Sequence, residues 1–409
     1  MRRATNQDSM TFMLAETQSS WEKLGHIFIV ADGMGAHAAG ELASKLAVEL
    51  IPHHYLKLRD MSPAEAIHKA INETNAEIYR RGQANIEFRS MGTTCSVLSL
   101  LPEGAVVAHV GDSRVYQQRG DQLFQLTFDH SLVWEMQAAG EVTDETARSG
   151  VIPKNVITRS LGPNSSVQID LEGPFPVLVG DRFLLCSDGL SGQITDEEIG
   201  ALLATLPPKQ ASQIFVDLSN LRGGPDNITA LVLEVVDERI TTSNDSAIAI
   251  RHGGPRRPFS TALGVVTAVC LLAAIILFLM NNIEIAIVVS VLGLIALITG
   301  LIQVYWTGGE PQDDDSRYGN GPYREFDAEA DKTFFERLAS TVNSLREAAE
   351  ERGWKIQWTD INSRFAQACH LAEERHFDKA LRIQVEVIID LMAQIRRQRN
   401  HASDSAIDL

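Results

Sequence analysis

Three apolar, β-branched runs in the first 236 residues each stop at an aspartate beside a glycine, namely Asp32, Asp112 and Asp188. A fourth aspartate, Asp226, stands just before another such run at 228–236. Runs of this kind bounded by turn residues are typical of β-strands. If neighbouring strands run antiparallel, the end of one and the start of the next share a rim of the sheet. The four carboxylates are therefore expected to converge.

A gathering of carboxylates suits hard divalent cations. A single Asp-Gly pair is more often an ordinary turn, but four such sites in one domain favour a shared role. Carboxylate oxygens without cysteine or spaced histidine partners prefer Mg²⁺ or Mn²⁺, and crowded carboxylates repel one another unless cations neutralise them. Two ions about 4 Å apart activate a water and hold a phosphate, so the pattern predicts phosphoryl chemistry.

Covalent catalysis is the alternative chemistry for this segment. Ser113, Cys186 and Ser187 stand next to the aspartates, but neither a Gly-x-Ser-x-Gly nor a Cys-x5-Arg pattern accompanies them. His37 is a candidate proton donor, although a histidine at a helix start or on the surface is the more ordinary interpretation. The predicted hydrolysis requires no nucleophilic side chain.

Eight short segments carry a further signal in their order. They are Arg3-x-x-Asn6-Gln7-Asp8, Asp32-Gly33-Met34-Gly35-Ala36-His37, Met91-Gly92-Thr93-Thr94, Gly111-Asp112-Ser113-Arg114, Asp129-His130-Ser131, Thr158-Arg159-Ser160-Leu161-Gly162, Ser187-Asp188-Gly189-Leu190 and Asp226-Asn227. This series resembles the type 2C metal-dependent serine/threonine protein phosphatase family in its bacterial form. The resemblance covers residues 1–236.

The resemblance implies metal-binding roles for the aspartates. Asp32 matches the carboxylate that bridges two metal ions, and Gly33 matches the residue whose backbone carbonyl binds one of them. Asp188 and Asp226 match ligands of the other ion. Asp112 together with Asp188 matches the pair that holds a third ion in bacterial members. Two or three Mg²⁺ or Mn²⁺ ions are therefore the expected cofactors.

The resemblance also implies the reaction. Asp8 matches an acidic residue that acts on the metals largely through bound water, and Arg3 matches the guanidinium that grips the substrate phosphate. Arg3, Asp8 and Asp32 are thus the expected catalytic residues. The implied reaction is direct hydrolysis of phosphoserine or phosphothreonine by a metal-activated water. Residues 132–156 correspond to a mobile flap that is expected to influence substrate choice.

The implied fold class is α+β. The expected architecture is an antiparallel β-sandwich flanked by helices, with four layers in the order αββα, over a phosphatase domain at 1–237. Apolar patterns at 39–55 and 63–80 agree with helices on the outside of the sandwich.

Two uncharged apolar runs, 259–280 and 285–306, are each about as long as a helix needs to be to cross a bilayer. We expect a transmembrane helical hairpin over 259–306, with linkers at 238–258 and 307–325. Arg251, Arg256 and Arg257 precede the first run, which places both flanking parts on the cytoplasmic side of the membrane. The predicted localisation is the inner membrane, with two passes.

Apolar residues recur at helical spacing across 326–400. The segment 365–391 looks like a tetratricopeptide helix pair, but repeats of that type need neighbours to bury their faces, and only one copy is present. A plain helical bundle is the alternative that we favour. Either arrangement offers a surface for a protein partner.

Composition bounds the remaining functions. The formal net charge of −17 argues against broad nucleic-acid binding, and the four scattered cysteines form no metal or disulfide pattern. The leading hypothesis is a membrane-anchored phosphatase that acts on phosphorylated proteins and opposes serine/threonine kinases of the same pathway. The alternative is a catalytically impaired pseudophosphatase that acts as a membrane scaffold or signalling adaptor. The intact Asp32, Asp188 and Asp226 set favours the enzyme.

Overall fold

The computed structural model describes residues 5–35, 38–143, 146–147, 152–153, 156–242, 261–280, 282–305 and 318–407. Two compact units make up the chain: residues 1–249 together with 318–409, and residues 250–317. The phosphatase region and the C-terminal helical region, which the sequence suggested as separate domains, therefore share one unit.

The first sheet of the larger unit has the strand order β1-β2-β4-β5-β8, and β3 pairs with β2 beside this path. All of its pairings are antiparallel. Its strands are β1 (Asp8–Met13), β2 (His26–Met34), β3 (Gly92–Thr93), β4 (Cys95–Leu101), β5 (Gly104–Val110) and β8 (Asp170–Phe175).

The second sheet has the order β10-β9-β6-β7-β11, again with antiparallel pairs throughout. Its strands are β6 (Arg114–Arg119), β7 (Gln122–Gln125), β9 (Arg182–Cys186), β10 (Ala230–Glu234) and β11 (Arg324–Asp327). The last of these comes from beyond the predicted hairpin.

Side-chain alternation along the strands builds the layers. In β2, Ile29 belongs to a core shared with the outer helices, whereas its neighbour Val30 belongs to the core between the two sheets. In β9, Leu184 and Leu185 divide in the same way. Successive side chains of a strand point to opposite faces, so a strand that is apolar at both positions is buried on both sides. The predicted αββα sandwich is confirmed.

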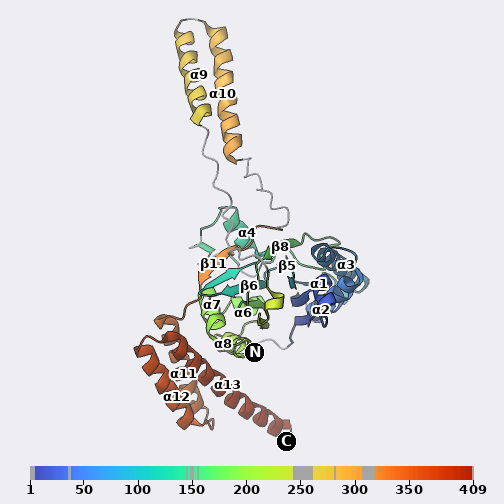
Figure 1. The fold of residues 1–409 in the computed structure, drawn as a ribbon, viewed down its shortest axis with the longest axis vertical. Helices are drawn as coiled ribbons and strands as arrows, with labels where there is room; N and C mark the ends of the chain where they lie inside the picture. The colour runs from blue at the N-terminus through green and yellow to red at the C-terminus, as the bar shows by residue number, and fades with distance from the viewer. Residues whose placement is uncertain are drawn as a thin grey trace. The chain divides into compact units, whose positions relative to one another are not determined.

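Helices cover both outer faces of the sandwich (Figure 1). The helices α2 (Ala39–Lys57) and α3 (Pro63–Ala84) pack on the first sheet, close to the predicted ranges. The helices α7 (Asp196–Thr205) and α8 (Pro208–Leu221) pack on the second. Shorter elements are α1 (Gln18–Leu24), α4 (Leu132–Ala138), α6 (Asp188–Ser191) and the 3-10 turns Ile86–Phe88 and Glu238–Ile240.

The C-terminal region is helical, as predicted. It consists of α11 (Lys332–Glu351), α12 (Trp358–Glu373) and α13 (Phe377–Ile407). Leu338 and Val342 of α11 and Val385 of α13 are fully buried in the same core as Phe215 of α8. The helical bundle and the second sheet's outer layer thus share one hydrophobic core.

The smaller unit contains two helices, α9 (Thr261–Leu279) and α10 (Ile283–Tyr305), which pack against each other as the predicted hairpin. Over the residues that the structure describes, however, no helix meets both the length and the apolarity needed to cross a membrane. The helical hairpin is therefore confirmed, and its assignment as a pair of transmembrane spans over 259–280 and 285–306 is not supported.

The predicted linker over 307–325 does not remain irregular to its end. Residues 318–323, which we call the strap, lie against β8: Gly173 N donates to the Tyr318 carbonyl over 3.1 Å. Buried Glu172 in the same strand accepts hydrogen bonds from Gly321 N and the Tyr323 hydroxyl. The chain then continues into β11, which pairs with β7. Pairing partners roughly 200 residues apart explain why local patterns missed this strand.

Stability is expected to depend on pH through Glu172. Burial raises the pKa of this carboxyl from 4.5 to about 7, and the hydrogen bonds from Tyr323 and Gly321 oppose that rise. Because the folded-state pKa is raised, the folded state holds the proton more tightly, and stability falls as pH rises from about 4.5 through about 7. The full loss is on the order of 3 kcal/mol.

The substitution Glu172→Gln should remove this loss, because the neutral amide can accept from Gly321 N and donate to Tyr323. Thermal melts between pH 5.5 and pH 8 are expected to show a smaller decline for this variant than for the wild type. The exposed Glu325 of β11 provides the control substitution Glu325→Gln. Parallel declines in all three proteins would contradict the assignment.

Candidate metal centre and active site

Five of the predicted site residues lie at one rim of the sandwich. Asp8 opens β1 directly opposite Asp32 in β2. Asp112 follows β5, Asp188 opens α6 after β9, and Asp226 precedes β10. Burial raises the pKa of Asp32 well above its usual range, and the charges of these four other aspartates raise it further. Carboxyls that are far apart in sequence are thus brought within electrostatic reach.

Asp8 connects the two sheets at this rim. Its Oδ2 atom accepts hydrogen bonds from Ser187 Oγ and Thr229 Oγ1, both over 2.8 Å. Ser187 follows β9 and Thr229 precedes β10, which are both strands of the second sheet, whereas Asp8 belongs to the first sheet. Burial raises the pKa of Asp8, and these two hydrogen bonds oppose that rise. The carboxylate is held by donors from across the sandwich.

Glycine beside Asp188 is required by close packing. A Cβ atom on Gly189 would lie 1.8 Å from the backbone oxygen of Asn227, so any other residue would separate the segment of Asp188 from that of Asp226. Gly33 is restricted in the same way, since its Cβ would lie 2.1 Å from the carbonyl oxygen of Gly40. The Asp-Gly pairs are therefore packing requirements of the rim as well as turn signals.

Asn227 holds the N-terminal segment in place, a role that the sequence pattern did not show. Its Oδ1 accepts from Gln7 N over 3.0 Å, and its Nδ2 donates to the Thr5 carbonyl over 3.1 Å. The only sign of this role in the sequence was that Asn227 follows Asp226 in one of the eight motifs. Arg3, the predicted phosphate-binding residue, lies outside the described residues, as does His37.

Buried oxygen atoms provide a test of whether this rim fits metal ions. Asp8 Oδ1 and Asp112 Oδ1 are both buried and accept no hydrogen bond. Burial, and then the charge of Asp188, raises the pKa of Asp112 to about 8. A buried oxygen without a donor is costly, and a divalent cation would remove that cost. The donor set consists of carboxylates, which suits Mg²⁺ or Mn²⁺.

The rim does not form a complete ligand cage by itself. In the described part of the chain, no group of three or more acidic, histidine or cysteine side chains is arranged closely enough to hold an ion alone. Mg²⁺ characteristically keeps several waters and binds through one or two carboxylates plus substrate phosphate. The residues therefore fit water-completed ion sites, and the individual ligand roles stay predictions.

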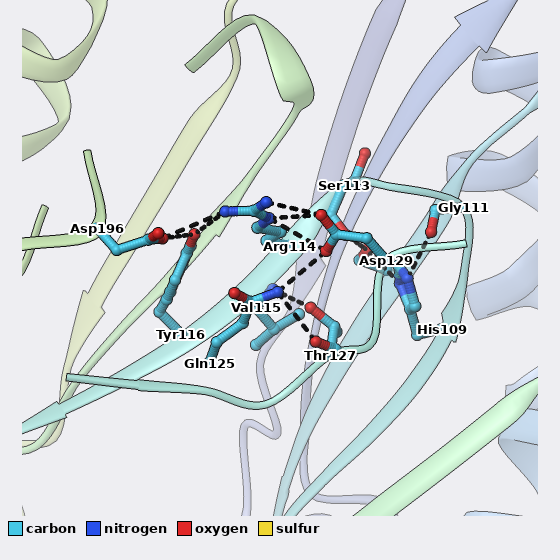
Figure 2. Close-up of polar contacts among 11 residues, drawn as sticks. His109, Gly111, Ser113, Arg114, Val115, Tyr116, Gln125, Thr127, Asp129 and Asp196 are labelled. Atoms are coloured by element: carbon cyan, nitrogen blue, oxygen red, sulfur yellow. Dashed lines mark hydrogen bonds and ion pairs between the residues drawn. The ribbon is translucent and has the colours of Figure 1, made fainter. Parts of the chain in front are cut away.

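A partly buried ion network is centred on Arg114, which pairs with Asp129 and Asp196 (Figure 2). Arg114 donates to Asp129 from Nε over 2.9 Å and from Nη2 over 2.7 Å. Its Nη1 atom contacts the Tyr116 hydroxyl over 2.9 Å and Asp196 over 3.2 Å. The network ties β6 to the segment before α4 and to the start of α7. It accounts structurally for the arginine and the aspartate of two of the sequence motifs.

A pocket of about 510 Å³ opens beside the metal rim. Asp112 and Asp188 belong to its wall, together with Arg114, Trp134 of α4 and Arg324 of β11. The predicted flap over 132–156 contributes α4 to this pocket, and part of that range lies outside the described residues. A substrate that reaches the rim would therefore meet the pocket as well.

Comparison with known proteins connects this geometry to a family. The sequence model of the protein phosphatase 2C family matches residues 2–220. The chain belongs to the protein phosphatase 2C family. The "Serine/threonine phosphatase stp" of Listeria innocua is 38% identical over 215 residues, covering 51% of this chain and 84% of that protein. The "Protein phosphatase PhpP" of Streptococcus pneumoniae is 36% identical over 216 residues, covering 52% and 87%.

The fold agrees with this membership. The structure of the S. agalactiae serine/threonine phosphatase superposes with a TM-score of 0.50 at 31% identity, covering 58% of this chain and 96% of that one. The sequence prediction of a metal-dependent serine/threonine protein phosphatase is therefore confirmed. The match to the phosphatase 2C family ends at residue 220 of this chain. The hairpin, the strap, β11 and the helical bundle lie beyond that residue.

Proposed function

We propose that the protein hydrolyses phosphoserine and phosphothreonine in proteins with a water activated by two or three Mg²⁺ or Mn²⁺ ions at the aspartate rim. The observation that carries this proposal is the position of Asp32, which lies partly buried within electrostatic reach of four further carboxyls. Such a cluster is unfavourable unless cations neutralise it. A pseudophosphatase scaffold has no physical need for it.

The chain's own residues would divide the work. Asp32, Asp188, Asp226 and the Gly33 carbonyl would hold two ions, and Asp112 with Asp188 a third. Asp8, held by Ser187 and Thr229, would orient a water through its buried Oδ1. Arg3 would bind the phosphate. When bound, the ions supply a water of lowered pKa and stabilise the charge of the phosphate.

The experiment uses the full chain with Mn²⁺ and peptides that carry phosphoserine, phosphothreonine or phosphotyrosine. We expect release of phosphate from the first two and its loss on addition of a chelator. Preference for phosphotyrosine would contradict the substrate class. Turnover that survives the chelator would contradict the metal site. Absence of turnover with every ion would favour the pseudophosphatase.

Partners follow from this proposal. Phosphorylated proteins are the substrates, serine/threonine kinases of the same pathway are the opposing enzymes, and nucleic acid is not expected as a partner. The helices beyond residue 326 remain a candidate protein-binding surface.

The inner-membrane location, which was predicted from the sequence, stays a proposal. Large apolar side chains are exposed along both helices of the hairpin, among them Leu272, Phe278, Ile287 and Leu292. Exposed apolar surfaces of this kind favour an apolar partner, which supports membrane attachment even though no described helix meets the requirements for a span. Recovery of the full chain in the soluble fraction of lysed cells would contradict this location.

A further inference from the structure

Gly111, the residue just before Asp112, is held by hydrogen bonds at both its amide and its carbonyl. Its N–H donates to His130 Nδ1 over 3.0 Å, and its carbonyl accepts from His130 N over 2.7 Å. The same carbonyl accepts from His109 Nε2 over 2.8 Å (Figure 2). Two fully buried histidines therefore fix the backbone to which Asp112 is attached.

The turn that carries Asp112 also rests against the segment of Asp32. Gly111 has a φ of +117°, which favours glycine, and a Cβ atom there would lie 2.6 Å from the Cβ of Thr94. Thr94 Oγ1 accepts from Asp32 N over 2.9 Å and lies 2.7 Å from Ser113 Oγ. A shift of this turn would therefore change the spacing of two predicted metal ligands.

The ring of His130 is oriented by Asp170, which opens β8. Asp170 Oδ2 lies 2.8 Å from His130 Nε2, and Arg159 Nη1 donates to Asp170 Oδ1 over 3.0 Å. An imidazole nitrogen that accepts a hydrogen bond carries no proton, so the ring proton of His130 lies on Nε2 and is donated to Asp170. The contact with Asp170 thus selects the tautomer that can accept from Gly111.

The carboxylate of Asp112 depends on this support. Its Oδ1 atom is buried and accepts no hydrogen bond from the described part of the chain. Its place at the rim is therefore set by the backbone turn to which it belongs. Groups that orient a metal ligand in this way typically change metal affinity by about 10- to 100-fold when they are removed.

We propose that His130, oriented by Asp170, is a positioning residue that holds the Gly111–Asp112 turn where Asp112 binds a divalent cation. This inference rests on the proposed function, in which Asp112 and Asp188 hold a third ion. It gives a role to the histidine of the Asp129-His130-Ser131 motif, which the proposed reaction does not otherwise use.

The first test measures Mn²⁺ binding to the full chain by calorimetry for two substitutions of His130. His130→Asn places an oxygen where Nδ1 lies and can still accept from Gly111 N. His130→Gln reaches the place of Nε2 and leaves that amide without its acceptor. We expect His130→Gln to raise the Mn²⁺ dissociation constant by about tenfold or more and His130→Asn to raise it less. Because glutamine is nearer to histidine in size, a space-filling role alone predicts the opposite order.

The second test asks whether His130 acts through Asp112. Asp112→Asn identifies the Mn²⁺ binding step that depends on this carboxylate. The double variant, with His130→Gln added, should bind Mn²⁺ no more weakly than Asp112→Asn alone, because two residues that act on one ion are not additive. Additive losses in the double variant would overturn the proposal.

Two further variants cover folding and specificity. His68 lies on the outer helix α3 and contacts Asn72 of the same helix, so His68→Gln is the matched control and should keep the wild-type affinity. If thermal melts show that His130→Gln does not fold, Asp170→Ala replaces it. This change leaves the imidazole free to adopt the other tautomer, so it should raise the same dissociation constant. An unchanged constant would overturn the proposal.

The outcomes separate this inference from the function on which it rests. A wild-type chain that neither binds Mn²⁺ nor hydrolyses p-nitrophenyl phosphate would defeat the phosphatase proposal itself. If the wild type does both and folded His130→Gln binds Mn²⁺ as tightly, the positioning role alone is overturned. Weaker binding by His130→Asn than by His130→Gln would overturn it as well.

Discussion

The Asp32→Asn variant is expected to lose Mn²⁺-dependent hydrolysis of p-nitrophenyl phosphate by about a thousandfold or more. Asp32 is the carboxyl on which the charges of Asp8, Asp112, Asp188 and Asp226 all act. A neutral amide of the same shape removes the charge that would bridge two ions, while it leaves the surrounding packing intact. Steady-state rates over a range of Mn²⁺ concentrations measure the effect.

Thermal melts of the same variant distinguish loss of the site from loss of the fold. Because burial and neighbouring carboxyls raise the folded-state pKa of Asp32, its ionisation destabilises the metal-free protein at pH values above the unfolded-state pKa. Asp32→Asn should therefore melt no lower than the wild type without metal, and it should gain less stability when Mn²⁺ is added.

The exposed Asp60, which follows α2, provides the matched control Asp60→Asn. It should keep both the wild-type rate and the wild-type response to Mn²⁺. If Asp32→Asn turned over substrate as fast as this control, Asp32 could not be a bridging ligand. The pseudophosphatase alternative would regain support only if the wild type were inactive as well.

The rim was predictable because its signals are local. Each aspartate adjoins a run of apolar residues that reads as a strand, and a glycine beside Asp32 and Asp188 marks a turn. Antiparallel pairing then places strand ends and starts together. The outer helices were predictable for a similar reason, since their apolar spacing persists over the whole of 39–55 and 63–80.

Contacts between distant segments were not predictable in this way. The strand β11 has only four residues, which is too few for a periodic pattern to be recognised. Its partner β7 lies about 200 residues earlier in the chain. No sequence pattern predicted a strand at Glu172 or the burial of this residue, and only the strap explains that burial. Arg324 fell in a range predicted as linker, so its place beside Trp134 depended entirely on tertiary structure.

The packing of the helical bundle also depends on contacts between distant segments. The spacing of its apolar residues predicted helices, but the surface that these helices cover is determined by the tertiary structure. Fully buried Asp217 of α8 pairs with Arg396 of α13, and Glu198 of α7 contacts Arg337 of α11 over 3.3 Å. Arg382 donates to the Thr205 carbonyl over 2.8 Å. These contacts make the bundle part of the layer that supports the second sheet.

A chain that ends after Thr242 is accordingly expected to be much less stable than the full chain. Truncation uncovers the core around Phe215, leaves the carboxylate of Asp217 without its arginine and removes the strand that pairs with β7. Each of these losses costs several kcal/mol in other proteins, so the melting temperature should fall by roughly 10–20 °C. Circular dichroism melts would measure it.

The matched control replaces 250–317 with a flexible Gly/Ser linker and keeps β11 and the bundle. This protein should melt close to the full chain, because the removed residues form a compact unit of their own. Similar melting of the truncated chain and this control would show that the bundle does not stabilise the phosphatase layer. A loss confined to the truncated chain would mean that residues beyond the phosphatase 2C match support the sheet from which Asp188 extends.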